Sequence, residues 1–220
     1  MYPAQFHRME RTEWNIVTRW KLAGFGVGVG LFFLLVLASE PGFVFIVDHA
    51  NLLFHEAGHP IFGLFSQRLE TYGGTIGQLV FPVVLAVSFW RKGQTLSFAG
   101  AWIWFFENWL NIARYMADAR AQLLPLVGGG DHDWHRILTR WGLLEYDTTL
   151  AAALKTIGWL GMLAACAWIG WRAWQDRNRS EPQTDFLPES LLDSEFPRRH
   201  AASESDRAKP SPRSIHATKL

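Results

Sequence analysis

Apolar segments almost free of charged residues dominate this sequence and restrict the folds open to it. Five such segments can be recognised, at residues 22–38, 43–65, 76–90, 95–117 and 148–171. A helix of about 20 apolar residues crosses the hydrocarbon core of a bilayer, and the apolar residues here are clustered rather than periodic along the whole chain. The pattern predicts an all-α, multi-pass integral membrane protein with about five membrane segments and the lipid bilayer as its first partner.

The third segment, residues 76–90, is the weakest of the five as a span. It has about fifteen residues and contains Gln78 and Pro82. A helix of this length barely crosses the hydrocarbon, so the segment either spans the membrane or re-enters on the same side. Before it, residues 67–74 have the composition of a loop, with Tyr72-Gly73-Gly74 as the expected turn.

The parts of the chain that flank the apolar segments are polar. Residues 1–21 are mildly basic and are expected to belong to the mature protein, and residues 119–147 are amphipathic, as in an interfacial helix. Residues 175–220 are rich in Ser, Pro and charged residues, which predicts a disordered tail. The membrane-embedded domain is therefore placed at residues 22–174. The Arg and Lys residues of the loops favour an N-terminus on the inside, although a re-entrant third segment would remove this preference.

Composition excludes several other functions. The formal net charge is +1, and no cluster of Lys and Arg with interleaved aromatic residues occurs outside the termini, so no nucleic-acid partner is expected. The single cysteine, Cys166, can form no intramolecular disulfide and is expected to pack as a small apolar residue. The glycines at 24, 26, 28 and 30 follow no strand, so close helix packing explains them better than a nucleotide-binding loop.

The second apolar segment carries the pattern His55-Glu56-Ala57-Gly58-His59. On a helix, histidines four residues apart share one face and the glutamate flanks them, which is how a helix presents two zinc ligands and a general base. Ionisable groups in hydrocarbon are costly and usually line a buried polar site. The alternative, a pair of hydrogen-bonded core histidines, leaves Glu56 without a role. Pro60 is expected to kink or end the helix just beyond His59.

A catalytic zinc site usually has three protein ligands, so a third must come from elsewhere in the chain. The candidates are Asp133, His132, Asp131, Asp118 and Asp48. Asp48 precedes His55 by two helical turns, about 10 Å along the axis, which is too far. The turn around Asp133 is favoured because three glycines let its backbone bend towards the site. Asp133 is preferred to Asp131 because it is expected to be the N-cap of a helix at residues 134–141. Alternatively, the turn caps an interfacial helix and binds no metal. In a further alternative, His132 is itself a ligand or a neighbour of one.

Asp118 belongs to a polar stripe on the fourth segment. Glu107, Asn111, Arg114 and Asp118 recur every three or four residues, which places them on one helix face. Such a stripe must face protein or water. A network of ion pairs and hydrogen bonds between helices, in which Arg114 neutralises Asp118, explains the stripe better than metal ligation does.

Together these motifs resemble the site-2 protease type of intramembrane zinc metalloproteases. Those proteins similarly carry H-E-x-x-H on a membrane helix, then a glycine-containing hairpin or loop, and later an aspartate ligand near a Leu-Pro and glycine-rich stretch. The matching pieces are residues 55–59, 72–74, 123–126 and 129–133. The Asn-x-x-Pro and Leu-Asp-Gly elements of the family are not reproduced, so Asp131 and Asp133 both stay open. The order of the H-E-x-G-H and H-D-W motifs also looks like that of small uncharacterised bacterial membrane proteins, which implies a bacterial inner membrane.

The resemblance implies a membrane-embedded zinc peptidase. Glu56 would be the catalytic base that takes a proton from a zinc-activated water, and the substrate would be a membrane-spanning or juxtamembrane peptide. Two other classes stay open: a non-catalytic zinc-binding scaffold and a metal transporter. Transport is disfavoured because no second segment carries both His and Glu and no inverted repeat is evident.

Overall fold

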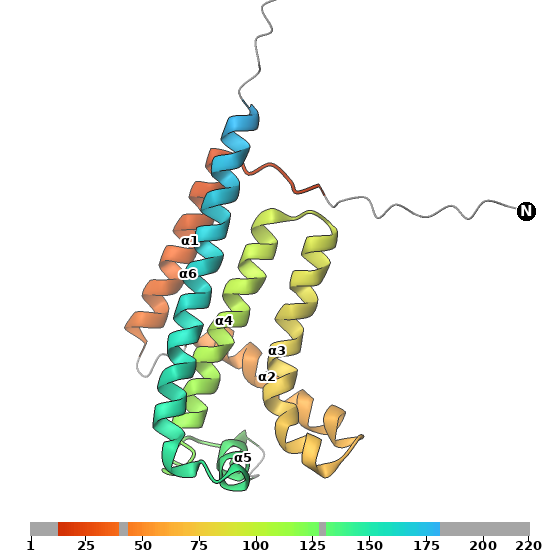
Figure 1. Cartoon of the computed structure of the whole chain (residues 1–220), viewed down its shortest axis with the longest axis vertical. Coiled ribbons are helices and arrows are strands. Elements are labelled where there is room, and N and C mark those ends of the chain that lie inside the picture. The colour runs from red at the N-terminus through yellow and green to blue at the C-terminus, as the bar shows by residue number, and fades with distance from the viewer. Residues whose placement is uncertain (1–12, 40–43, 128–130, 181–220) are drawn as a thin grey trace, which may run out of the picture. The chain divides into compact units, whose positions relative to one another are not determined.

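The computed structural model describes residues 13–39, 44–127 and 131–180, and these residues form helices and no strands. The helices are α1 (Arg19–Ala38), α2 (Phe45–Gly63), α3 (Gln67–Arg91), α4 (Thr95–Ala117), α5 (Asp133–Trp141), the short 3₁₀ helix η2 (Leu144–Tyr146) and α6 (Asp147–Ser180). The predicted all-α class is therefore confirmed. In Figure 1, α3 and α4 form an antiparallel pair, and the short α5 lies at the end of the bundle where α6 begins.

Within the described residues, three helices are long and apolar enough to cross a membrane. They are α1, α3 and α6, with the span in α6 measured from Leu144 to Arg177. The bundle buries little of these helices, and only 6% of the apolar window of α1 is covered by the rest of the chain. Lipid is the natural environment for such faces, so the structure supports a membrane protein. Five spans are not confirmed, because α2 and α4 are not among the candidates.

Residues 67–74 are helical, so the predicted loop at this position was wrong. The helix α3 runs without a break for 25 residues and passes through Pro82. Ser66 caps its first turn, since its side-chain oxygen accepts a hydrogen bond from the backbone N–H of Leu69 at 3.1 Å. The predicted segment 76–90 is thus only part of a helix that is long enough to span, and a re-entrant helix is not confirmed.

The glycines that suggested a turn serve instead to bring α2 and α3 into backbone contact. A Cβ atom on Gly73 would lie 2.6 Å from the carbonyl oxygen of Gly58, and one on Gly77 would lie 2.5 Å from the carbonyl oxygen of Phe54. Any side chain at these positions would force the helices apart. Small residues permit the same close approach in membrane helix pairs generally. This crossing turns the His55 face of α2 towards α3.

The polar stripe of α4 faces α2. The side-chain amide of Asn51 donates to Glu107 Oε2 at 2.8 Å, and the indole N–H of Trp104 donates to Asn51 Oδ1 at 2.8 Å. One turn further along, the amide of Asn111 donates to the carboxylate of Asp48. The prediction of an interhelical hydrogen-bond network is therefore confirmed for this stripe.

The sequence predicted that Arg114 neutralises Asp118, whereas the contacts of Asp118 described here are with the loop after α4 and with His132. The Asp118 carboxylate, at the C-terminal cap of α4, accepts hydrogen bonds from the backbone N–H groups of Leu123 and Leu124 at 2.9 and 3.0 Å. One of its oxygens also lies 3.5 Å from Nε2 of His132. By accepting from these two backbone donors, Asp118 organises the loop that follows α4.

The last helix extends further than the sequence predicted. α6 ends at Ser180, so residues 175–180 are helical, while the remainder of the predicted tail, 181–220, lies outside the described residues. The buried Asp176 explains the extension, because its carboxylate accepts a hydrogen bond from the backbone N–H of Val17 at 3.0 Å and lies 3.6 Å from the guanidinium of Arg172. Cys166 packs beside Met162 and Ala165, as expected of a small apolar residue. At the glycines of α1, nothing in the described part of the chain comes within 4 Å of a Cβ position.

Candidate metal centre

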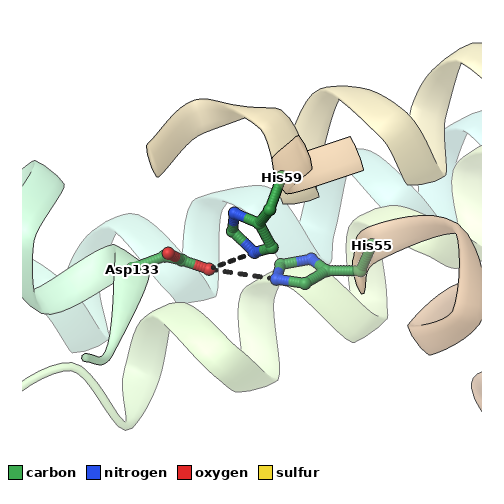
Figure 2. A group of neighbouring side chains, drawn as sticks. All are labelled: His55, His59 and Asp133. Atoms are coloured by element: carbon green, nitrogen blue, oxygen red, sulfur yellow. Dashed lines mark hydrogen bonds and ion pairs between the residues drawn. The ribbon is translucent and has the colours of Figure 1, made fainter. Parts of the chain in front are cut away.

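Two helices bring three potential ligand atoms together. Nε2 of His55 lies 3.0 Å from Oδ2 of Asp133, and Nε2 of His59 lies 3.2 Å from the same oxygen. The three side chains offer atoms that all lie within 4.8 Å of one another, and Figure 2 shows both rings directed at the carboxylate. The histidines come from one face of α2 and the aspartate from the start of α5. The structure thus gathers the three residues that the sequence favoured as ligands.

The outer nitrogen of each imidazole ring is held by an oxygen that can only accept hydrogen bonds. Nδ1 of His55 lies 3.0 Å from the carboxamide oxygen Oε1 of Gln78, and Nδ1 of His59 lies 2.8 Å from the backbone carbonyl oxygen of Glu70. Each Nδ1 must therefore carry the proton that makes its bond. In the neutral ring, Nε2 then presents a lone pair, which is the form that binds a metal.

The centre of the cluster favours a positive ion. Burial alone raises the pKa of the Asp133 carboxyl, but hydrogen bonds with His55 and His59 outweigh burial and leave this pKa below its ordinary value. Asp133 is therefore an anion, and its oxygen lies beside two Nε2 atoms that donate protons to it or, with a cation between them, present lone pairs to that cation. Such atoms repel one another unless a proton or a cation lies between them. The N···O distances are close to the roughly 3.3–3.6 Å expected between ligand atoms of a tetrahedral zinc site.

The ring of His55 is positioned by close packing against Gly74 of α3. A Cβ atom on Gly74 would lie 2.5 Å from Cε1 of His55, so the imidazole ring packs directly on the backbone of α3. Sequence reasoning assigned this glycine to a turn and missed its role. It also gave Gln78 no role, although a polar residue inside an apolar segment is a signal of a buried polar site.

Asp133 is positioned by α5 and by Tyr115. The N-cap of α5 is His132, whose ring nitrogen Nδ1 accepts from the backbone N–H of His135 at 3.2 Å, so the prediction that Asp133 is the N-cap was wrong. Asp133 is instead the first residue of the helix, and its backbone N–H donates to the hydroxyl oxygen of Tyr115 at 3.1 Å. The ring of Tyr115 in turn packs against His55, with 5.7 Å between the ring centroids. Nothing in the sequence pattern indicated this role of Tyr115.

The alternative ligands lie outside the cluster. Exposed Asp131 lies 3.6 Å from the guanidinium of Arg136, and buried His132 packs at a tilt against Tyr115 with 4.1 Å between the ring centroids. Asp118 holds the loop after α4, and Asp48 accepts from the backbone N–H of Val44 and from Asn111. The glycines 128–130, which were expected to bend the turn, lie outside the described residues.

A cavity of about 490 Å³ opens beside the cluster, which is within the range of ligand-binding sites. His55, His59 and Asp133 line it together with Glu56, the predicted general base. Glu56 is half-buried and follows His55 directly on α2, so its carboxylate shares one space with the potential metal ligands. The arrangement combines a group that could hold a cation, a neighbouring carboxylate and room for another molecule.

In comparisons with known proteins, the chain matches no known protein family, no curated protein and no solved structure.

Proposed function

We propose that this protein is a zinc-dependent peptidase embedded in the inner membrane of a bacterium, with His55, His59 and Asp133 as zinc ligands and Glu56 as the general base. The observation that carries the proposal is the convergence of two Nε2 atoms on one carboxylate oxygen, at 3.0 and 3.2 Å, with both Nδ1 atoms already held by outer oxygens. Metal-binding histidines typically have such outer partners.

Zinc is the ion that suits this donor set best. Two imidazole nitrogens are borderline donors and the carboxylate oxygen is a hard one, a mixture that zinc accepts, whereas magnesium and calcium prefer sites made mainly of oxygen. Structural zinc sites are usually closed by four protein ligands, whereas catalytic sites have three and leave a position for water. The cluster offers three side chains and borders a cavity. This favours a catalytic site over the zinc-binding scaffold.

Glu56 is the residue proposed to move protons. When bound, zinc would lower the pKa of a water molecule to about 7 and polarise a peptide carbonyl. Glu56 would accept one proton from the attacking water while the oxygen of that water forms the new bond to the carbonyl carbon. The carbon–nitrogen bond then breaks, and Glu56 returns the proton to the leaving amine. The proposed substrate is a membrane-spanning or juxtamembrane peptide, because the apolar helices α1, α3 and α6 would hold the site in or beside the bilayer.

The decisive experiment separates zinc binding from catalysis. In this scheme Glu56 is no ligand, so Glu56→Gln is expected to keep about one zinc per chain and to lose cleavage of transmembrane peptides by about 100-fold or more. Zinc content is measured by elemental analysis of protein purified in mild detergent, and cleavage by mass spectrometry. Equal inactivity of the two proteins on a broad peptide panel, with zinc retained in both, would favour the scaffold. Loss of zinc in Glu56→Gln would show that Glu56 is a ligand or a structural partner.

A further inference from the structure

A second cavity adjoins the metal centre. Its volume is about 300 Å³, and it shares His55, Glu56 and Tyr115 with the first cavity. Leu52 of α2 and residues 124–127 of the loop between α4 and α5 form an apolar wall of this cavity. Polar side chains line the rest of it: Asp48, His49, Gln78, Asn111 and Arg114. The cavity therefore begins at His55 and Glu56 and has an apolar wall along Leu52 and residues 124–127.

Gln78 lines this second cavity and has an unused hydrogen-bond donor. The residue is only 2% exposed, and its Oε1 is engaged by Nδ1 of His55. Because His55 Nδ1 carries a proton when Nε2 faces the metal centre, the carboxamide must present oxygen to the ring and direct its NH₂ group elsewhere. Within the described residues, that nitrogen, Nε2, has no hydrogen-bond acceptor. A buried donor without an acceptor is costly, and it marks a place where a ligand can supply one.

The chemistry of these walls fits a peptide better than a lipid. A peptide carries a carbonyl oxygen at every residue, which can accept from Gln78, and an apolar side chain can fill the space beside Leu52 and Leu124. A lipid acyl chain would match the apolar walls but would leave the buried donor unpaired. The shared residues His55 and Glu56 place the cavity directly next to the proposed reacting groups.

We propose that the second cavity is a substrate subsite that receives an apolar residue beside the scissile peptide bond, and that Gln78 Nε2–H donates to a carbonyl oxygen of the substrate backbone. The proposal rests on the peptidase function proposed above. It assigns Gln78 two simultaneous bonds: its oxygen orients His55, and its nitrogen anchors the peptide.

The test measures peptide binding to full-length, zinc-loaded Glu56→Gln protein in detergent, because this background leaves the peptide intact. The probe is a fluorescent polyleucine peptide flanked by lysines, compared with a polyalanine peptide of the same length, and affinity is read from fluorescence anisotropy. We expect polyleucine to bind about tenfold more tightly, because leucine fills the apolar cavity and alanine does not.

Two substitutions in that background separate the parts of the subsite. Leu124→Trp fills the cavity and should weaken polyleucine binding by about tenfold or more. Gln78→Glu keeps an oxygen for His55 but removes the NH₂ donor, so it should retain zinc and weaken both peptides by about tenfold. Val84→Ala is the matched control, because Val84 lies on the same helix as Gln78 and is exposed. It should change neither zinc content nor affinity.

Zinc content and a monodisperse elution profile confirm that each variant is folded. If Leu124→Trp does not meet these folding criteria, Leu124→Ala is used in its place. The enlarged cavity should then shift the binding preference from the polyleucine probe towards a phenylalanine-containing probe. Unchanged affinity and preference in the Leu124 and Gln78 variants, with zinc retained, overturn the subsite. Wild-type protein that binds these peptides in the predicted way without cleaving them overturns the peptidase function alone. With Glu56 restored, cleavage with an unchanged KM in the Leu124 and Gln78 variants overturns the subsite alone.

Discussion

Gly74 of α3 lies in contact with the imidazole ring of His55 on α2, so close that even a methyl group at residue 74 would overlap the ring. The same face of α3 supplies Gln78, which holds the outer nitrogen of that ring, and the backbone carbonyl of Glu70, which holds the outer nitrogen of His59. The packing of α3 on α2 and the aim of both histidines are therefore set by one set of contacts.

The contact at Gly74 gives the first prediction. Gly74→Ala should displace the ring of His55 and weaken zinc binding by about 10- to 100-fold, the range seen when groups that orient metal ligands are changed. Zinc affinity is measured by competition with a chelator. Gly170→Ala is the control, since its Cβ would meet open space, and it should leave affinity unchanged. Equal zinc affinity in the two variants would contradict the proposal that packing on Gly74 positions the ring of His55.

The second prediction concerns the two histidines. His55→Ala and His59→Ala should each remove zinc from the purified protein, because either change leaves only two ligands of the proposed three. His49→Ala is a suitable control, because His49 lies on the same helix and its ring contacts Phe45. Elemental analysis gives the result, and full zinc content in either ligand variant would reject the site.

The third prediction distinguishes the aspartates. Asp133→Ala should abolish tight zinc binding, and Asp131→Ala should leave it intact because Asp131 is paired with Arg136 at the surface. Asp118→Ala should retain the ligand set while destabilising the fold by about 1–3 kcal/mol, since the backbone N–H groups of Leu123 and Leu124 lose their acceptor. Zinc titration and thermal unfolding are measured for all three variants. A variant pattern in which Asp131→Ala loses zinc and Asp133→Ala keeps it would move the third ligand to Asp131.

The fourth prediction concerns the polar contact between α2 and α4. Asn51 is fully buried and bonds both Glu107 and Trp104. Asn51→Leu leaves Glu107 and Trp104 without this hydrogen-bond partner. It should lower the free energy of unfolding by about 1–3 kcal/mol for each of these two groups left unsatisfied. Leu53→Ala on the exposed side of α2 is the control and should change stability by about 0.5 kcal/mol or less. Equal melting temperatures of the two variants would show that the network contributes little.

Periodicity and motif chemistry were sufficient for much of this architecture. The predicted bounds of α4, residues 95–117, agree with the structure, and the third-ligand candidate Asp133 lies beside His55 and His59. The first turns of α3 could not be predicted in this way. Gly73 and Gly74 are typical of turns when read locally, and only the backbone of α2 on the other side makes them necessary within a helix. Tyr115 is likewise meaningful only once α5 has folded back onto α4, because its partner is a backbone N–H at Asp133.

The distribution of the cluster along the chain has a consequence for biosynthesis. His55 is incorporated 78 residues before Asp133. At about 5–20 residues per second, roughly 4–16 s of translation separate them. For all but the first four residues of this interval the nascent chain contains both histidines but no Asp133, so the cluster described here can close only after α4 has been made and α5 has begun. A ribosome stalled before residue 133 would therefore hold a chain with two histidine ligands and weak metal retention, and release of the stall would be the step that completes the centre.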